Sequence, residues 1–269
     1  MISNNILIYV DDLKHINDYR KVGVSAFLFA LDGYSVGYNT YSLEEIKKEE
    51  VSNKYIMINR MLDCNDVDRL KEILKDVKGI KGIVYEDIAV YRIALELKLD
   101  VELIFFQNHF GTNVHSVNFW LNRVNSMFIS NEITKDEIDL ITKEAIKPVC
   151  INLYGYNQVM YSRRLLLSNW SEEFNIPYKS TNVLEDKATH VKFRAIENDY
   201  GTVMYSDKIF NGKDLIGLGN VKFFYVNPMM IEHNIVMDFF NDIVEHVSEL
   251  EDDGFLNRET IYKLKERNK

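Results

Sequence analysis

Residues 82–109 read GIVYEDIAVYRIALELKLDVELIFFQNH, and this stretch contains the repeating unit that decides the fold. An apolar run at 82–85 is followed by Glu86-Asp87 and then by a helix-period segment at 88–97. A second apolar run at 101–106 ends in the polar residues Gln107-Asn108-His109. Short strands that alternate with helices of roughly 10–15 residues predict successive right-handed βαβ units and a parallel sheet.

The same unit recurs on both sides of this stretch. The expected strands are 6–10, 26–31, 55–58, 82–85, 101–106, 127–130 and 149–153, with helices near 12–20, 42–50, 66–77, 88–97, 114–123 and 138–145. Ser42 with Glu45, and Thr134 with Glu137, have the spacing of capping boxes. Seven consecutive units favour closure into an α/β TIM-like (β/α)8 barrel, and 269 residues suit a fold that needs roughly 250.

The repeat changes after the seventh strand. Residues 156–210 read as an irregular insertion that contains β structure, with a hairpin expected at 191–196 and 202–205 around a turn at 198–201. The apolar run 221–226 precedes a helix-like stretch at 231–250, so we expect it to be the eighth strand, beside 6–10. We therefore predict one barrel domain over 1–250, with the insertion over the C-terminal mouth between strands 7 and 8. A helical tail is expected at 251–269.

Composition excludes several classes of function. A net charge of −9 argues against a generally basic nucleic-acid surface, although a local basic patch is compatible with it. The two cysteines, Cys64 and Cys150, are too few for a disulfide framework or a four-cysteine metal site. There is no run of about 20 apolar residues, and the first residues lack the features of a signal peptide. We expect a soluble cytoplasmic protein without membrane association.

Polar side chains at the carboxyl ends of the strands form the expected functional surface, because barrel enzymes keep their sites there. This ring comprises Asp11, Asp32, Asn59, Arg60, Glu86, Asp87, Asn108, His109, Glu132, Tyr154, Tyr156 and Asn227. Helix capping fully explains Asp12, Asp32 and Asp87. It does not explain Asn59, Gln107, Asn108 or Glu132, which precede the best cap positions.

Three features of this surface leave alternatives open. His109 has no partner at the HExxH spacing, so a structural or surface role is favoured over a functional one. Arg163-Arg164 could bind an anion, pair with Glu132 or form a solvated pair of charges. A substrate could stack on Tyr154, Tyr156 and Tyr161, or these rings simply pack within the insertion. P-loop, GxGxxG and GxSxG motifs are absent from the sequence.

Four short segments between residues 112 and 170 follow one another in a recognisable order. They are Thr112-Asn113, then Ser130-Asn131-Glu132-Ile133-Thr134, then Tyr154-Gly155, and then Arg163-Arg164-Leu165-Leu166-Leu167-Ser168-Asn169-Trp170. In order and spacing they resemble the collagenase-like peptidase family U32. That family has an Asn-rich strand end, then Ser-Arg-Glu-Leu-Ser, His-Gly and Gly-Arg-Cys-Leu-Leu-Ser-Asn-Tyr. Asn59 falls where its third strand ends in Asn.

The departures from the family pattern are as informative as the matches. Leu165 stands where the family has its first cluster cysteine, and the later cysteines are missing from 170–180. Tyr154 replaces the family's histidine, and Asn131 replaces the arginine of its Ser-Arg-Glu motif. The residues that match are Asn59, Glu132, Gly155, Arg164 and Ser168.

The resemblance implies two hypotheses. In the first, the chain is a peptidase-like hydrolase or cluster-free modification enzyme, with Glu132 as the catalytic acid or base. In the second, it is an accessory or cluster-free member of an RNA-modification (hydroxylation) system, and its partner is a cluster-bearing paralogue. The substituted cysteines and histidine favour the second, with RNA or a peptide as the bound substrate. The expected substrate-binding residues are Asn59, Asn108, His109, Asn113, Tyr154 and Arg164.

The same resemblance gives an expected arrangement for Glu132. Thr134 already supplies the helix cap, so capping does not account for this carboxylate. We expect Glu132 to turn into the barrel mouth and to pair with a cation or polar group from the segment after strand seven, where Arg164 could hold its carboxylate ionised.

We predict that the purified protein carries no iron–sulfur cluster and no other cofactor of its own. Each iron corner of a cluster needs its own ligand, and Leu165 replaces one of the thiolates. Anaerobic purification followed by iron and sulfide quantification checks this. Stoichiometric iron with a visible charge-transfer band in the isolated chain would contradict it.

Overall fold

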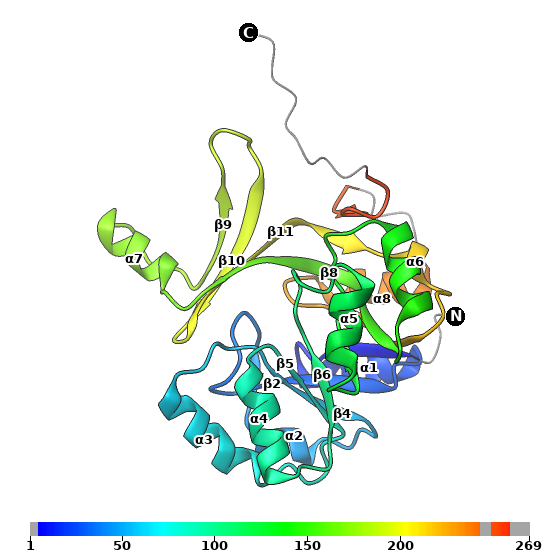
Figure 1. The fold of residues 1–269 in the computed structure, drawn as a ribbon. Coiled ribbons are helices and arrows are strands. Elements are labelled where there is room, and N and C mark those ends of the chain that lie inside the picture. The colour runs from blue at the N-terminus through cyan, green and yellow to red at the C-terminus, as the bar shows by residue number, and fades with distance from the viewer. Residues whose placement is uncertain (1–4, 243–248, 259–269) are drawn as a thin grey trace.

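A curled sheet of parallel strands forms the centre of the computed structural model, which describes residues 5–242 and 249–258 (Figure 1). Its strands are β1 (Ile6–Tyr9), β2 (Ala26–Leu31), β4 (Lys54–Ile58), β5 (Gly82–Tyr85), β6 (Glu102–Phe105), β7 (Ser126–Met127), β8 (Val149–Ser162) and β12 (Val221–Asn227). β12 lies between β8 and β1, and Ile6 is opposite Phe224 in a parallel pair, as predicted. A parallel bridge between Phe128 and Cys150 brings β7 beside β8. The architecture is that of a TIM-like barrel.

Helices follow the barrel strands at the predicted places. They are α1 (Ile16–Lys21), α2 (Leu43–Lys48), α3 (Cys64–Leu74), α4 (Ile88–Leu97), α5 (Val114–Leu121), α6 (Lys135–Glu144) and α8 (His233–Asn241), with short 3-10 turns η1 (Leu13–His15) and η2 (Lys213–Leu215). Both predicted capping boxes are present at α2 and α6. Asp12 and Asp87 are N-caps, as predicted. Asp32 is not a cap and accepts a hydrogen bond from the Thr40 hydroxyl at 2.9 Å, next to the short strand β3 (Thr40–Tyr41).

Successive side chains of the barrel strands enter two different apolar cores. In β1, Leu7 and Tyr9 point into the barrel, whereas Ile6 and Ile8 pack against the helices. The interior core also includes Met57, Val84, Ile104, Phe106, Phe128, Cys150, Phe223 and Tyr225. Both faces of these strands are buried, which is why the sequence reads as continuous apolar runs and not as an alternating pattern.

β8 is much longer than the predicted strand at 149–153. It runs for 14 residues, because its second half leaves the barrel and pairs antiparallel with β11 (Gly201–Asn211). β11 pairs with β10 (Lys192–Asn198), and Asn198 is opposite Gly201, which confirms the predicted hairpin. β9 (Thr181–Glu185) and α7 (Leu166–Glu173) complete this part of the chain. We call residues 159–204 the arm, and Figure 1 shows it projecting from the barrel.

The predicted helical tail at 251–269 is wrong where it can be compared. Glu251–Asp252 form β13, which pairs parallel with β11, and turns occupy 253–258. An acidic run followed by Gly254 at a φ of 58° cannot form an amphipathic helix, and Leu256 is the buried apolar side chain there. Residues 259–269 lie outside the described residues. The predicted helix at 231–250 is shorter as well, since Asp242 adopts a left-handed conformation after α8, and 243–248 also lie outside the description.

Membrane association was not expected from the sequence. Within residues 5–242 and 249–258, none of the helices has the length and apolar character that a bilayer crossing requires.

Glu197 attaches α7 to the rest of the arm. Its side chain is buried, and its carboxylate accepts hydrogen bonds from the Leu167 and Ser168 amides at 2.7 and 2.9 Å. The Ser168 and Thr202 hydroxyls also donate to it. Burial alone would raise the pKa of Glu197, but these four hydrogen bonds outweigh burial and hold the pKa below its ordinary value. The carboxylate therefore caps the first turn of α7, where the free amides favour negative charge.

We predict that Glu197→Ala selectively loosens α7. Two amides and two hydroxyls lose their acceptor, at a cost of about 2 kcal/mol, so amide exchange across 167–173 should accelerate roughly 30-fold. Hydrogen–deuterium exchange resolved by residue measures this. The control is Glu185→Ala in β9, whose exposed carboxylate pairs with His190, and it should leave α7 protected. Unchanged exchange in α7 of Glu197→Ala would show that the cap is unimportant.

Candidate functional site

Five amide side chains meet at the C-terminal mouth of the barrel. Asn108 and Asn227 continue the inward-facing positions of β6 and β12, and Asn152 occupies the inward position after Cys150 in β8. Together with Asn157 and Gln158, which come from the next part of β8, they line a cavity of about 20 Å³. Because β8 turns from the barrel into its pairing with β11 here, its residues 154–158 cover the mouth.

Aromatic side chains form the walls of this mouth cavity. They are Tyr38, Phe106, Tyr154, Tyr156, Tyr205, Phe210 and Tyr225. Burial raises the pKa of Tyr38, Tyr205 and Tyr225, so these phenols are neutral at physiological pH. The Tyr205 hydroxyl donates to the Gly37 carbonyl at 2.8 Å. None of the described residues that line the cavity has a charged side chain.

Several polar atoms at the mouth cavity lack a protein partner. The amide oxygens of Asn108, Asn152 and Gln158 are buried and accept no hydrogen bond from the described residues. Buried polar atoms are normally paired, so groups of unpaired ones mark places that bind water or a ligand. A cavity of about 20 Å³ has room for a single water molecule.

Gly155 makes the covering strand possible. Its φ is 133°, a left-handed value that favours glycine, and a Cβ atom there would lie 2.4 Å from the Asn227 carbonyl oxygen. The backbones of β8 and β12 therefore touch directly at the rim. Any side chain at this position would push β8 away from the mouth, which gives a physical reason for the glycine that resembles the family's His-Gly motif.

Glu86 is the carboxyl group most strongly perturbed by this environment. It follows β5 directly, and its Oε1 atom is buried without a hydrogen-bond partner among the described residues. Burial raises the pKa of Glu86 to about 8. A charge on Glu86 would raise the pKa of Tyr38 and Tyr205, so Glu86 lies near these two tyrosines of the mouth cavity. At neutral pH this side chain keeps its proton, and a protonated carboxyl can donate a hydrogen bond.

The expected pairing of Glu132 with Arg164 is wrong. Glu132 lies at the surface with 47% of its side chain exposed, and its carboxylate faces His109 Nδ1 at 3.3 Å. Arg164 is exposed on the arm, where its backbone contacts Ser162 and Thr202. The chain after β8 runs outward into the arm, which carries Arg164 away from the rim. Glu132 instead borders a separate cavity of about 150 Å³ that shares Asn157 and Gln158 with the mouth cavity.

Two predicted substrate-binding asparagines already have structural partners. The Asn59 amide is buried and makes a two-point contact with the Val36 backbone, accepting from its N–H at 3.1 Å and donating to its carbonyl at 3.0 Å. Asn113 is the N-cap of α5 and accepts from the Ser116 amide. Of the predicted residues, Asn108 and Tyr154 do line the mouth cavity. The Tyr154 ring stacks on Phe239 with centroids 4.0 Å apart.

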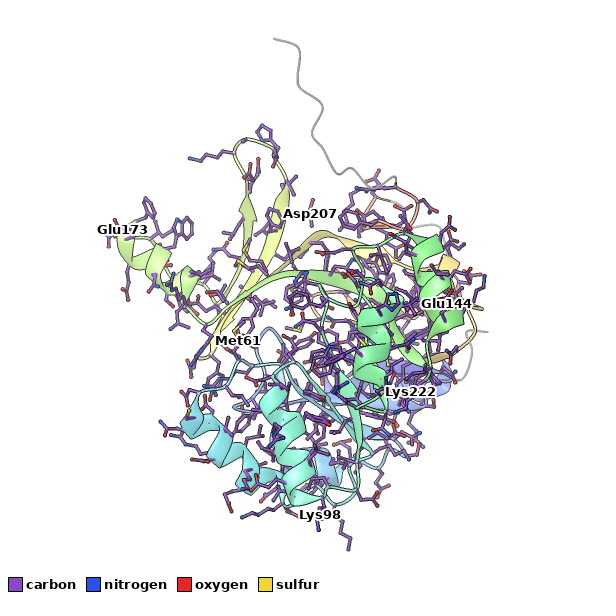
Figure 2. The ribbon with its side chains drawn as sticks, viewed as in Figure 1. Met61, Lys98, Glu144, Glu173, Asp207 and Lys222 are labelled. Atoms are coloured by element: carbon purple, nitrogen blue, oxygen red, sulfur yellow. The ribbon has the colours of Figure 1, made fainter. Side chains whose placement is uncertain are left out.

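Arginine side chains gather where the arm meets the barrel. Arg60 donates to Asp66 at 2.6 Å, and its guanidinium lies over the Tyr200 ring at 4.1 Å. Arg69 lines the same cavity of about 320 Å³. Arg163, at the base of the arm, lies 3.8 Å from Asp63 of this cavity. Arg164 is the next residue in the chain, and we call these four residues, Arg60, Arg69, Arg163 and Arg164, the arginine group. Figure 2 shows Met61, which follows Arg60, at this junction.

The mouth contains residues that the predicted site did not include. Glu86 and Asn227 belong to the predicted polar ring but were not among the chosen site residues, and Asn152 and Gln158 were missed. The available signal is parity within each strand: Val84 and Glu86, like Ile104 and Asn108, differ by even numbers of residues and so share a face. This parity does not identify the site unless it is known which face of each strand lies in the barrel interior.

Comparisons with known proteins agree with this fold. The model of peptidase family U32 matches residues 41–227. Over 203 residues the chain is 26% identical to tRNA hydroxylation protein P2 of Bacillus subtilis (strain 168). This match covers 69% of the chain and 66% of the relative, so the chain spans just under two thirds of that relative's length. The solved U32 peptidase Mk0906 has a TM-score of 0.50 and 7% identity, over 84% of this chain and 93% of that structure, and it supports the fold alone. Because the family model covers well over half of the sequence, this chain belongs to peptidase family U32.

Proposed function

We propose that this chain is a cluster-free, accessory member of an RNA-hydroxylation system and that it binds RNA where the arm meets the barrel. Family membership and the relative named tRNA hydroxylation protein P2 support a role in RNA modification. In this proposal, the two ends of the insertion at 156–210 cover the barrel mouth while the arm between them projects from the barrel, and the protein works in the cytoplasm.

The arginine group is the observation that carries the proposal. Four arginines lie at one junction of a chain whose net charge is −9, and the acidic side chains paired with them are Asp63 and Asp66. Arginines held beside exposed or half-buried tyrosines suit single-stranded RNA, which is bound through phosphate contacts and stacking. Tyr200 and Tyr161 supply the rings: the Tyr161 hydroxyl donates to the Tyr200 carbonyl at 3.3 Å and accepts from the Met61 amide.

The cysteine positions support the absence of a resident cluster. Cys150 is buried inside the barrel, where burial raises the pKa of its thiol to about 12, so it stays protonated. Cys64 is exposed at the start of α3, on a different element. Leu165 precedes α7 at the place that resembles the family's first cluster cysteine. A cluster-bearing paralogue would then supply the redox chemistry, and this chain would contribute RNA binding.

Exposed aromatic side chains on the arm support such a partner. Trp170 and Phe174 of the α7 region are 41% and 63% exposed, and their rings lie 6.1 Å apart. Figure 2 shows Glu173, next to Phe174, at the outer end of α7, away from the barrel. Neighbouring exposed aromatic residues are typical of protein contacts.

A peptidase-like hydrolase is the second candidate function. It is favoured by Glu86, a buried carboxyl at the barrel mouth whose pKa is raised to about 8 and whose Oε1 atom has no partner among the described residues. Such a group suits general acid catalysis near neutral pH. In this alternative Glu86, and not Glu132, is the catalytic acid or base.

We expect Arg163→Ala/Arg164→Ala to weaken RNA binding. Loss of two cations should lower the affinity for an unmodified tRNA transcript roughly tenfold at 0.1 M salt and reduce the salt slope by about 1 to 2. Filter binding over a salt series measures both quantities. The control is Lys75→Ala/Lys78→Ala at the far end of α3, which removes the same charge and should change affinity little. Equal effects of the two double variants would argue against a site at the arm.

Glu86 predicts a pH dependence of stability. Because its pKa is raised from 4.5 to about 8, the folded protein retains a proton that the unfolded chain releases. The contribution of Glu86 to the free energy of unfolding therefore falls as the pH rises from about 5 to 8, by at most about 1.4 kcal/mol per pH unit. Above pH 8 this contribution stays constant. Glu86→Gln should become progressively more stable than wild type over this range, as measured by urea unfolding at pH 5 to 9. Parallel curves for Glu86→Gln and wild type over this pH range would refute the assignment.

A further inference from the structure

We infer that the arm is a hinged element and that its contacts with two loops of the barrel act as a latch, which keeps the mouth closed. The arm would control the mouth whatever molecule binds at the arginine group, so the inference goes beyond the proposed function.

Two strands connect the arm to the barrel, and their pairing is irregular at the connection. β8 carries the chain into the arm and β11 carries it back (Figure 1). Gln158 pairs with Tyr205 and Tyr156 pairs with Ile209, so β11 advances by four residues while β8 advances by two. The register shifts again on the other side of Tyr205. Irregular pairing bends a sheet and disrupts its ladder, and a few such residues are enough for a hinge.

This hinge, which we define as residues 156–158 with 205–209, is also part of the cover of the mouth. Asn157 and Gln158 lie in the hinge and line the mouth cavity. The Asn157 amide donates to the Ser206 hydroxyl oxygen at 3.0 Å, so a side chain provides the acceptor where the ladder is interrupted. Rotation of the arm about the hinge would therefore move the side chains that cover the cavity.

The latch lies where the turn between β10 and β11 meets the barrel. The Asn198 side chain donates to the Ser35 carbonyl at 3.1 Å, and the Tyr200 ring lies 4.1 Å from the Arg60 guanidinium. These two contacts join the arm to loops that follow β2 and β4, away from the hinge. A body that is attached at both a hinge and a latch rotates only when the latch opens. In this structure the mouth cavity of about 20 Å³ has room for one water molecule, so the latched state is the closed one.

The latch is weak compared with the parts that it joins. The Asn198 hydrogen bond is only partly buried, and a cavity of about 320 Å³ lies beside Tyr200. A cation–π contact at such an accessible place contributes little stability. Arg60 itself is held to the barrel by Asp66 at 2.6 Å, and the Glu197 carboxylate holds the arm together. The latch can therefore open while the barrel and the arm stay folded.

The hinge also has a fixed point on the barrel. The Tyr205 side chain is buried, and its hydroxyl donates to the Gly37 carbonyl at 2.8 Å. A buried hydrogen bond of this kind is costly to break, because both groups would lose their partner away from water. The arm would thus rotate about Tyr205 when the contact between Tyr200 and Arg60 is lost.

Substitutions at Tyr200 test the latch. Tyr200→Leu removes the ring that lies over Arg60 and keeps an apolar side chain, whereas Tyr200→Phe keeps the ring. The control is His190→Ala at the opposite turn of the arm, where the imidazole contacts Glu185. Residue-resolved hydrogen–deuterium exchange of the full chain reports how often each segment opens.

We expect Tyr200→Leu to accelerate amide exchange of the hinge roughly tenfold, while α7 exchanges at the wild-type rate because the arm moves as one body. Tyr200→Phe and His190→Ala should exchange like the wild type. Hinge amides of Tyr200→Leu that exchange at the wild-type rate would refute the latch. Faster exchange in α7 as well would refute the hinged motion, because the arm would then unfold and not rotate. Equal acceleration in Tyr200→Phe would show that the ring does not hold the arm, which also overturns the inference. RNA is absent from these measurements, so the proposed function is tested separately.

Discussion

The close approach of Gly155 to Asn227 is the constraint on which the functional part of this molecule depends. Without a side chain at 155, β8 can touch the rim of the barrel while it changes partners from β12 to β11. A Cβ atom would meet the Asn227 carbonyl oxygen at 2.4 Å. One strand therefore belongs to the barrel wall, the cover of the mouth and the arm, and the three parts are mechanically connected.

This connection places two different chemistries close together. The mouth is neutral, with amides and tyrosines around a small cavity, and Glu86 beside it keeps its proton at neutral pH because burial disfavours its charge. The junction with the arm is basic, with arginines that stand out from an acidic chain. The proposed RNA ligand would meet the second of these surfaces through its phosphates.

The retained and lost family residues acquire distinct physical meanings. Gly155 is retained where backbones touch, and Ser168 is retained where its amide and hydroxyl both donate to Glu197 at the start of α7. Leu165 precedes that same helix start. The arm is thus held by a buried carboxylate, which keeps its shape independent of any metal ligand at 165. Glu132, also retained, lies at the surface beside His109.

The sequence by itself determined the parallel barrel, because short apolar runs alternating with capped helices permit few other folds. It determined the eighth strand, the hairpin of the arm and the caps at Asp12 and Asp87 with both capping boxes, since these depend on local patterns, whereas Asp32 proved not to be a cap. It could not select the site. Both faces of each strand are buried, so nothing in the apolar runs distinguishes Asn108, which faces the cavity, from Asn59, which serves Val36. Closure of the sheet and the turn of β8 across its mouth decided which polar residues meet, because those contacts join residues far apart in the chain.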